Sequence, residues 1–595
     1  MVVAFGLAMR LARIAATRLM ASIRSAIRRR FHGGLAVKSS FEIAQDAELE
    51  PIPSLAHRIG LEPDEYEPYG RYKAKVALSV IDRFQHRPDG KLVCVTGMTP
   101  TTAGEGNTTT LVGLTQGLGV IGKRPVACLR EPSLGPVFGV KGGAAGGGLT
   151  QVVPMEDLNL HFTGDIHAIG AANNLLAAMI DASILHGNPH RIDALRVDWR
   201  RALDMNDRTL RRVVVGLGGR PNGYARETGF DITAASEVMA VLAVARDMND
   251  LRRRLGAITV AHRYNDGGPV TAENLGAAGA MTVLLKDALK PNLIQTLEGQ
   301  PCLMHCGPFA NIDHGNNSLI ADLIGMKLGD YVVTESGFGS DMGMEKFFDI
   351  VCRLGGLTPS AAVLVTTVRA IKHHGGSADD APQHRGEGLC AIEIGMANVR
   401  RHLGIVREFG VPCVVAVNRR PEDAAEEVEL VRDLALDAGA FSAEINEGFE
   451  KGGLGAADLA RAVVDACERP NEFRQLYPDD APIRDKIETV AKRVYGARDV
   501  FLYPEAERSI DQFERDGLGH FPVCMAKTQL SLSADPALAN APRDFTVIVR
   551  DIRAYTGAGW LVPLCGDIQQ MPGLGKTPAA LNVDIDAEGR TVGLF

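Results

Sequence analysis

The chain has 595 residues, 46% of them hydrophobic and 23% charged, and a formal net charge of −8. This composition is that of a folded soluble protein and excludes a largely disordered chain, while the mild negative charge gives no general attraction to nucleic acid or to an anionic membrane. The length predicts roughly two to four domains. Glycine makes up 65 residues, more than the usual ~7%, so the excess is expected in particular loops.

The first 41 residues differ from the rest of the chain. They contain no Asp or Glu but seven arginines, which is typical of an organelle transit peptide. The alternative interpretation is a non-functional extension from a start site assigned too far upstream. Because the arginines interrupt the apolar runs, no transmembrane helix is expected there. We predict a cytoplasmic protein, or one of the mitochondrial matrix if residues 1–41 are a transit peptide, with no nucleic-acid or membrane partner.

The ten cysteines lie mostly inside apolar runs, as reduced core thiols do, and this favours a reducing compartment. The closest pair is Cys302 and Cys306, with His305 between them. Zinc sites usually need a second such pair, and none follows in the sequence. We therefore predict no structural metal site there.

Wholly apolar short runs recur along the chain and indicate strands buried on both faces, as in a parallel sheet covered by helices. They lie at residues 92–95, 213–217, 257–260, 331–333, 361–365 and 414–417. Residues 236–255 show the apolar spacing of one helix, which Gly256 is expected to end. The alternation predicts an α/β fold with a mostly parallel sheet of the P-loop NTPase type, helices on both faces, and smaller α/β domains.

The strand at 92–96 runs into a loop of small residues, and helical spacing follows from Leu111 onward. This context is that of a phosphate-binding loop, in which backbone N–H groups and a helix N-terminus surround phosphate oxygens. Thr108 lies where a P-loop hydroxyl holds Mg²⁺, but Thr101 replaces the opening glycine and Asn107 the lysine. The alternative is a plain tight turn. The predicted phosphate-binding residues are Thr99, Pro100, Thr101, Thr102, Ala103, Gly104, Glu105, Gly106, Asn107, Thr108 and Thr109.

A second glycine cluster follows within 40 residues. Arg130 begins the stretch REPSLGP, and after Lys141 every residue to Gly148 is Gly or Ala. Such residues let the backbone approach an anionic or planar ligand closely, whereas the alternative is a flexible hairpin. Arg130 is always charged and can hold a carboxylate or phosphate through two parallel hydrogen bonds.

These stretches resemble formate–tetrahydrofolate ligases. The similarity runs nearly collinearly over about residues 42–595. It includes REPSLGPVFGVKGGAAGGG at 130–148, NLHFTGDIHAIGAANNLLAA at 159–178, GPFANIDHGNNS at 307–318 and TESGFGSDMGMEKF at 334–347. The resemblance implies that ATP phosphorylates formate and that N10 of tetrahydrofolate then attacks the formyl carbon and releases phosphate. It also implies Mg-ATP, activation by a monovalent cation such as K⁺ or NH₄⁺, and a homotetramer.

The resemblance also assigns roles to residues. Residues 99–109 would bind the ATP phosphates and Arg130 would hold formyl phosphate. Glu131 and Asp165 would line the same pocket and orient the metal or the folate amine, and Arg420 and Phe449 would contact the pterin. The implied division is an N-terminal extension at 1–41, a nucleotide and formyl phosphate domain at 42–390, an α/β domain contributing to the folate site at 391–480, and a C-terminal domain at 481–595.

This chain differs from the family at three positions to which the resemblance assigns a role. Asn107 replaces the loop lysine, Arg420 replaces a stacking phenylalanine, and Phe449 replaces a stacking tryptophan. The alternatives to full activity are therefore a divergent enzyme with reduced or altered activity, or a nucleotide- and folate-binding scaffold without catalysis. A generic P-loop NTPase would instead hydrolyse ATP without formate. Adjacent residues His373 and His374 are expected in a polar loop rather than at a metal.

Overall fold

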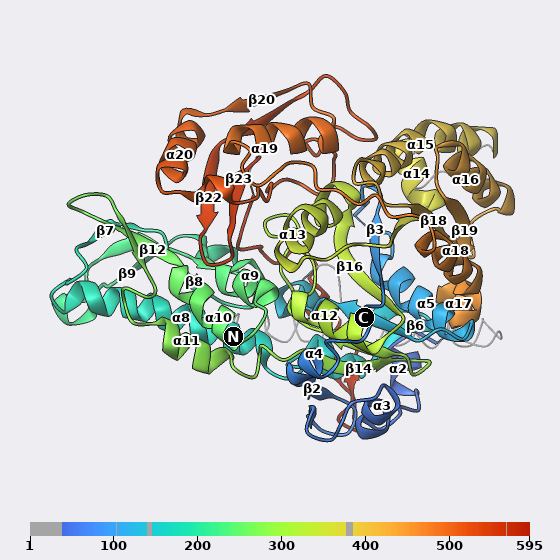
Figure 1. Ribbon diagram of the computed structural model, residues 1–595, viewed down its shortest axis with the longest axis horizontal. Coiled ribbons are helices and arrows are strands. Elements are labelled where there is room, and N and C mark those ends of the chain that lie inside the picture. The colour runs from blue at the N-terminus through green and yellow to red at the C-terminus, as the bar shows by residue number, and fades with distance from the viewer. Residues whose placement is uncertain (1–37, 103, 140–144, 377–384, 567, 595) are drawn as a thin grey trace, which may run out of the picture.

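The computed structural model describes residues 38–594, except 103, 140–144, 377–384 and 567. Its centre is a twelve-stranded sheet (Figure 1). The main path of this sheet runs through β1 (Tyr66–Pro68), β2 (Ala74–Val76), β14 (Asn292–Thr296), β15 (Pro301–Met304), β4 (Pro125–Leu129), β16 (Tyr331–Gly339), β3 (Lys91–Gly97), β17 (Ala361–Thr366), β18 (Cys413–Asn418) and β19 (Ser442–Asn446). From β15 to β19 every neighbouring pair is parallel.

Helices cover both faces of the parallel part, as the sequence predicts. Alternate residues of β3 enter two different cores. Val93 and Val95 pack in the cluster that contains α5 (Asn107–Val120) and α18 (Ala457–Cys467). Cys94 packs in the cluster that contains α12 (Leu319–Leu328) and α15 (Arg385–Glu408). The α/β fold with a mostly parallel sheet is therefore confirmed, because strands covered on both sides need apolar residues at every position.

The prediction of a parallel strand is wrong for two of the apolar runs, those at 213–217 and 257–260. β9 (Val213–Val215) pairs antiparallel with β10 (Arg226–Thr228), and Val214 is exposed. β12 (Thr259–Arg263) lies in a separate three-stranded sheet between β13 (Pro269–Thr271) and β7 (Ile192–Val197), with antiparallel pairing on both sides. The β-branched residues of these runs favour strands, but what covers a strand is decided by the rest of the fold.

The predicted single helix at 236–255 is also wrong, because two helices occupy this region. α9 (Glu237–Val244) ends before Ala245, and α10 (Met248–Ala257) begins after Asp247. The Asp247 carboxylate accepts hydrogen bonds from the backbone N–H groups of Asn249 and Asp250 and so starts the second helix. Gly256 lies within α10 and does not end it.

Helix α8 (Asp165–Leu185) is the only helix in the described part of the chain whose length and composition would allow it to cross a membrane. Ile169, Leu176 and Ile180 are fully buried in the main core. Helices α8, α9, α10 and α11 (Ala278–Leu285) form the lobe on the left of Figure 1. One face of α8 is therefore packed inside this lobe, and 39% of its most apolar stretch is buried.

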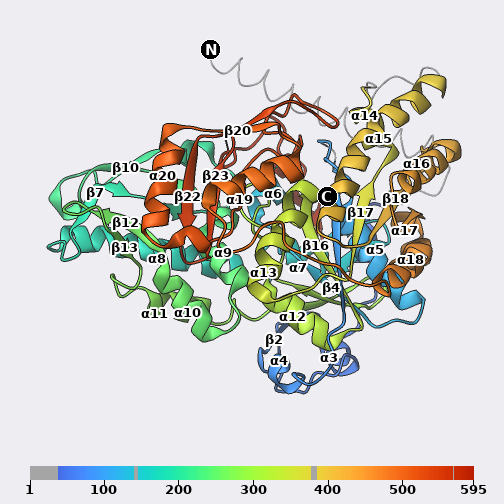
Figure 2. The same ribbon diagram turned by 45° about the horizontal axis from the view of Figure 1, so that its top comes forward.

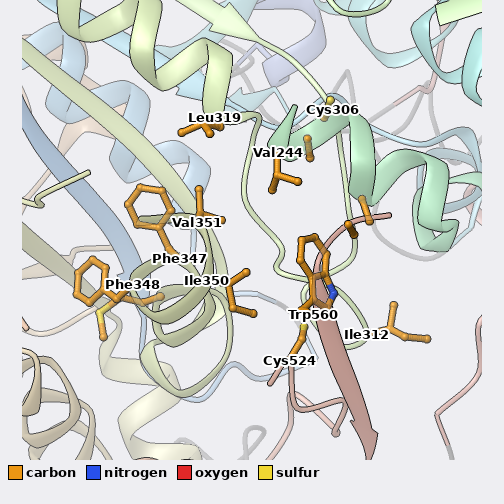
Figure 3. Packing of buried hydrophobic residues seen from close by; sticks show 14 of the residues in the cluster. Val244, Cys306, Ile312, Leu319, Phe347, Phe348, Ile350, Val351, Cys524 and Trp560 are labelled. Carbon is orange, nitrogen blue, oxygen red and sulfur yellow. The ribbon is translucent and has the colours of Figure 1, made fainter. Parts of the chain in front are cut away.

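The C-terminal segment packs across the top of the molecule, with α19 (Ile483–Thr489), α20 (Pro504–Arg515), β22 (Asp551–Tyr555) and β23 (Trp560–Leu564) (Figure 2). Trp560 is fully buried and meets the His314 ring edge-on at 5.6 Å. Figure 3 shows the indole beside Ile312 and Cys524, with Phe347 nearby in the same core. The nine buried cysteines and the exposed Cys390 are all free thiols.

Residues 391–480 extend the main sheet, because β18 pairs with β17 and β19 pairs with β18. The predicted boundary between residues 390 and 391 falls within α15. The phosphate loop and the segments that the resemblance assigns to folate therefore lie at the carboxyl ends of neighbouring strands of one sheet. In open α/β sheets this edge is where ligands bind.

Candidate active site

The loop between β3 and α5 has the conformation expected of a phosphate-binding loop. Gly104 and Gly106 have φ angles of +73° and +84°, which glycine adopts readily and other residues do not. Glu105 Oε1 accepts hydrogen bonds from the backbone N–H and the hydroxyl of Thr101, both at 2.8 Å. Among the residues that the structure describes, no side chain caps the N-terminus of α5, so its first N–H groups are available to an anion. Ala103 lies outside the described residues.

Two contacts with the segment after β17 hold this loop in place. The hydroxyl of Thr367 donates to Glu105 Oε2 at 2.6 Å, and Arg369 Nη2 donates to the carbonyl of Gly104 at 3.0 Å. Arg369 Nε is buried without a hydrogen-bond partner in the described part of the chain. Arg369 therefore places a cation beside a loop that has no lysine of its own.

The other end of the loop is held by two histidines. His374 Nε2 lies 2.9 Å from the carbonyl oxygen of Thr99, and His402 Nε2 lies 3.0 Å from the Thr99 hydroxyl. Burial lowers the pKa of His402 to about 4, so its ring is neutral at pH 7. His374 ends the helix α14 (Val368–His374) and is buried, so the expectation of a polar loop at His373 and His374 is wrong.

A buried carboxylate joins the loop to the second predicted anion-binding residue. The Thr108 hydroxyl donates to Glu335 Oε1 at 2.5 Å, and Arg130 Nε donates to Glu335 Oε2 at 2.9 Å. Burial by itself would raise the pKa of Glu335, but the charge of Arg130 and the hydrogen bonds from Thr108 and Arg130 outweigh it and hold this pKa below its usual range. Glu335 is therefore ionised at neutral pH.

This contact depends on strand order. Arg130 follows β4, Glu335 lies in β16 and Thr108 follows β3, and these three strands are neighbours with β16 in the middle. In P-loop NTPases an acidic residue on a neighbouring strand shares Mg²⁺ with the loop hydroxyl. Sequence reasoning missed Glu335, although it lies only two residues after the predicted strand at 331–333.

Asn107 occupies the lysine position with a short neutral side chain. Its Nδ2 donates to the carbonyl of Phe338 at 2.9 Å, and its amide lies so close to Gly97 that a Cβ built there would be 2.8 Å from Oδ1. Phe338 itself has a φ angle of +62°. The amide therefore ties the start of α5 to β16 but brings no positive charge to the phosphate site.

Glu131 and Asp165 lie together in a second buried cluster. Burial, and next the charge of Asp165, raise the pKa of Glu131 well above its usual range. Lys75 is almost fully buried and its Nζ lies 2.5 and 2.6 Å from the two oxygens of Asp165. Asn292 Nδ2 donates to the same carboxylate at 2.8 Å. Sequence reasoning missed Lys75, whose short strand carries no recognisable motif.

A chain of side-chain amides connects the phosphate loop to the predicted folate residues. Asn418 Nδ2 donates to the carbonyl of Glu105 at 3.0 Å, and Asn446 Nδ2 donates to Asn418 Oδ1 at 2.7 Å. Asn446 Oδ1 accepts from the backbone N–H of Gly448 at 3.1 Å, at the start of α17 (Gly448–Lys451), which carries Phe449. The loop and α17 are thus coupled through three successive hydrogen bonds.

Phe449 and Arg420 both reach the surface. Half of the Phe449 side chain is exposed, and the second glycine cluster packs against it, with the N–H of Leu149 donating to the Phe449 carbonyl at 2.9 Å. A Cβ at Gly148 would lie 2.1 Å from that carbonyl oxygen, so this position requires glycine. Arg420 follows β18, where its backbone N–H donates to Asp423. Lys141 lies outside the described residues.

The whole described part of the chain matches one known protein family. A model of the formate–tetrahydrofolate ligase family matches residues 38–595. A formate–tetrahydrofolate ligase of Desulforamulus reducens is 58% identical over 565 residues, which cover 94% of this chain and 100% of that protein. Proteins of the same name from a Roseiflexus species and from Granulibacter bethesdensis are 56% and 54% identical, covering 93% and 94% of this chain and 100% and 97% of their own lengths. The chain therefore belongs to the formate–tetrahydrofolate ligase family.

Proposed function

We propose that this chain joins formate to tetrahydrofolate at the expense of ATP, forming 10-formyltetrahydrofolate, ADP and phosphate through formyl phosphate. The observation that carries this proposal is the contact of Thr108 and Arg130 with the same carboxylate, that of Glu335. It brings the nucleotide loop and the arginine assigned to formyl phosphate within reach of one transferring phosphoryl group. The membership of the chain in the ligase family supports the same assignment.

The residues present fit Mg²⁺ bound with the nucleotide. Mg²⁺ prefers oxygen ligands and is usually held by one or two protein groups together with substrate phosphates and water. The Thr108 hydroxyl and the ionised Glu335 carboxylate are such groups, and they are already in contact. The bound metal would neutralise charge on the phosphate oxygens.

In the first step, a formate oxygen attacks the γ-phosphorus of ATP, and the bond from phosphorus to the β-γ bridging oxygen breaks to release ADP. The N–H groups at the start of α5 and the guanidinium of Arg130 stabilise the charge on the phosphoryl oxygens. Formate is a poor acylating agent, and phosphorylation gives it a leaving group. In the second step, N10 attacks the formyl carbon, the carbon–oxygen bond to phosphate breaks, and the N10 proton is lost.

The cluster of Glu131 and Asp165 is the acceptor that we assign to this proton. Asp165 forms an ion pair with Lys75 at 2.5 Å. A carboxylate within hydrogen-bond reach of the amine can accept its proton as the bond to carbon forms. Arg420 and Phe449 would contact the pterin, the phenyl ring by stacking and the guanidinium through its planar face.

The test is the formation of 10-formyltetrahydrofolate with ATP, formate and tetrahydrofolate, measured together with ADP. We expect ADP to appear only when formate is present. Arg130→Ala should lower turnover at least ~100-fold, the usual effect of losing one transition-state donor. The side chain of the exposed Arg550 makes no hydrogen bond or ion pair in the described part of the chain, so Arg550→Ala is the matched control. ADP formation without formate would indicate a generic NTPase, and ligand binding without turnover would indicate a scaffold.

Three further properties belong to this proposal. Activation by K⁺ or NH₄⁺ is tested by comparing turnover in potassium, ammonium and sodium salts. A homotetramer is tested by light scattering of the purified protein. A cytoplasmic location, or a mitochondrial one with residues 1–41 removed, is tested by sequencing the N-terminus of the protein isolated from its cells.

A further inference from the structure

A cleft of about 700 Å³ lies beside α15, away from the residues assigned to catalysis. One wall is α15 itself, and the others are the turn that follows the π-helix Val490–Tyr495 and the segment before β21 (Thr546–Val549). Ligand sites in proteins commonly have volumes of ~300–1,000 Å³. The cleft is lined by Ala397, Arg400, Arg401, Gly496, Arg498, Ala541, Pro542, Arg543 and Asp544.

The lining is strongly basic. It contains four arginines and one acidic residue, Asp544. Arg400 and Arg543 are exposed, and their side chains make no hydrogen bond or ion pair in the described part of the chain. Arg498 is paired with Asp499 at 2.8 Å, outside the cleft lining. Two guanidinium groups on opposite walls therefore remain free to bind a ligand.

Arg401 is held in the cleft without being neutralised. Its Nη2 donates to the backbone carbonyls of Arg493 and Val494 at 2.7 and 2.9 Å, and its Nε is buried without a hydrogen-bond partner in the described part of the chain. Burial lowers the pKa of Arg401, although Glu408 and Asp341 oppose this. An unpaired buried donor is costly, and an anion in the cleft would provide both the acceptor and the opposite charge.

The cleft is tied to the phosphate loop by one residue of α15. Asn398 lies three positions before Arg401, about one turn away on the same side of the helix, and its Oδ1 accepts from the Thr99 N–H at 3.2 Å. Its Nδ2 also donates to the carbonyl of Asn540 at 2.7 Å, next to the cleft residue Ala541. A ligand that moves residues 541–544 would therefore change the position of the phosphate loop through Asn398.

We propose that this cleft binds a small anion with several phosphate or carboxylate groups, at a site separate from the phosphate loop. Guanidinium groups bind both kinds of group through paired hydrogen bonds. The cleft lining includes no residue of the phosphate loop, and Arg400 lies two positions from both Asn398 and His402, which places it on the other side of α15 from these two loop contacts. This site is independent of the proposed ligase chemistry and would remain if that assignment failed.

The test is isothermal titration calorimetry of the full chain with two probes, inorganic tripolyphosphate and the peptide Glu-Glu-Glu. The variant is Arg400→Ala/Arg543→Ala, and the charge-matched control is Arg196→Ala/Arg550→Ala, because these two arginines are exposed and their side chains make no hydrogen bond or ion pair in the described residues. We expect the first variant to weaken binding of at least one probe tenfold or more, and the control to leave it unchanged.

The stronger probe identifies the ligand as a phosphate or a carboxylate compound. Ligase turnover without added anion is expected to be the same in wild type and both variants, which checks that the chain is folded. The proposal is overturned if neither probe binds at millimolar concentration, if the cleft variant binds as the wild type does, or if the control variant loses binding to the same extent. If tripolyphosphate bound only at the phosphate loop, the cleft variant would bind it as the wild type does.

Discussion

Replacing Asn107 with lysine tests whether the phosphate site of this chain is short of one positive charge. A preorganised donor aimed at charge in the transition state contributes ~2.7–4 kcal/mol. The substitution also removes the hydrogen bond from Asn107 to the Phe338 carbonyl, which is 2.9 Å long and contributes ~1 kcal/mol. The net gain is ~2–3 kcal/mol. Since ~1.4 kcal/mol corresponds to tenfold in rate, we expect Asn107→Lys to raise kcat about 30- to 150-fold.

The assay is 10-formyltetrahydrofolate formation at saturating ATP, formate and tetrahydrofolate. Asn107→Gln is the matched control, because it lengthens the side chain without adding charge and should not raise kcat. Equal kcat values for wild type and Asn107→Lys would refute the reasoning. That result would mean that two arginines already supply the charge that the loop lacks. These are Arg130, which donates to Glu335, and Arg369, which donates to the Gly104 carbonyl.

Two further predictions concern buried charges. Lys75→Met leaves the Asp165 carboxylate buried without its ion pair and should destabilise the fold by ~3–5 kcal/mol, measured by urea unfolding. Lys38→Met removes an exposed pair with Asp46 and should leave the free energy of unfolding nearly unchanged, so similar losses in the two variants would contradict this. Burial raises the pKa of Glu237 to about 8, so its stabilising contribution is present at low pH and is lost as pH rises from ~4.5 toward 8. Glu237→Gln should therefore gain in melting temperature relative to wild type between pH 5 and pH 8, and a difference that does not change with pH would contradict the assignment.

The strands and loops of the site could be predicted because their signals are local. The strand at 92–95, the loop of small residues after it and the helix from Leu111 onward form one contiguous pattern, and the structure has all three parts. The strands at 331–333, 361–365 and 414–417 were correct for the same reason, since each is apolar at every position. The run at 213–217 has the same pattern but is half exposed, because nothing in its own sequence specifies what packs against it.

The partners of the site residues could not be predicted in this way. Glu335 meets Thr108 across 227 positions of the chain, and Lys75 meets Asp165 across 90. Each pair depends on which strands are neighbours, and a short apolar run contains no information about its neighbour. The resemblance to the ligase family supplied Arg130, Glu131 and Asp165 as candidates, but their hydrogen-bond partners required the assembled sheet.

The excess of glycine in the sequence determined where the backbone takes conformations that other residues avoid, as at Gly104 and Gly106, where φ is positive. The sequence also determined that the loop has asparagine in place of lysine. Only the tertiary structure decided which charges surround this loop, because Arg130, Arg369 and Glu335 come from three different strands or the segments after them. Local conformation is set by neighbouring residues, whereas the electrostatics of a site are set by all the segments that a shared core brings together.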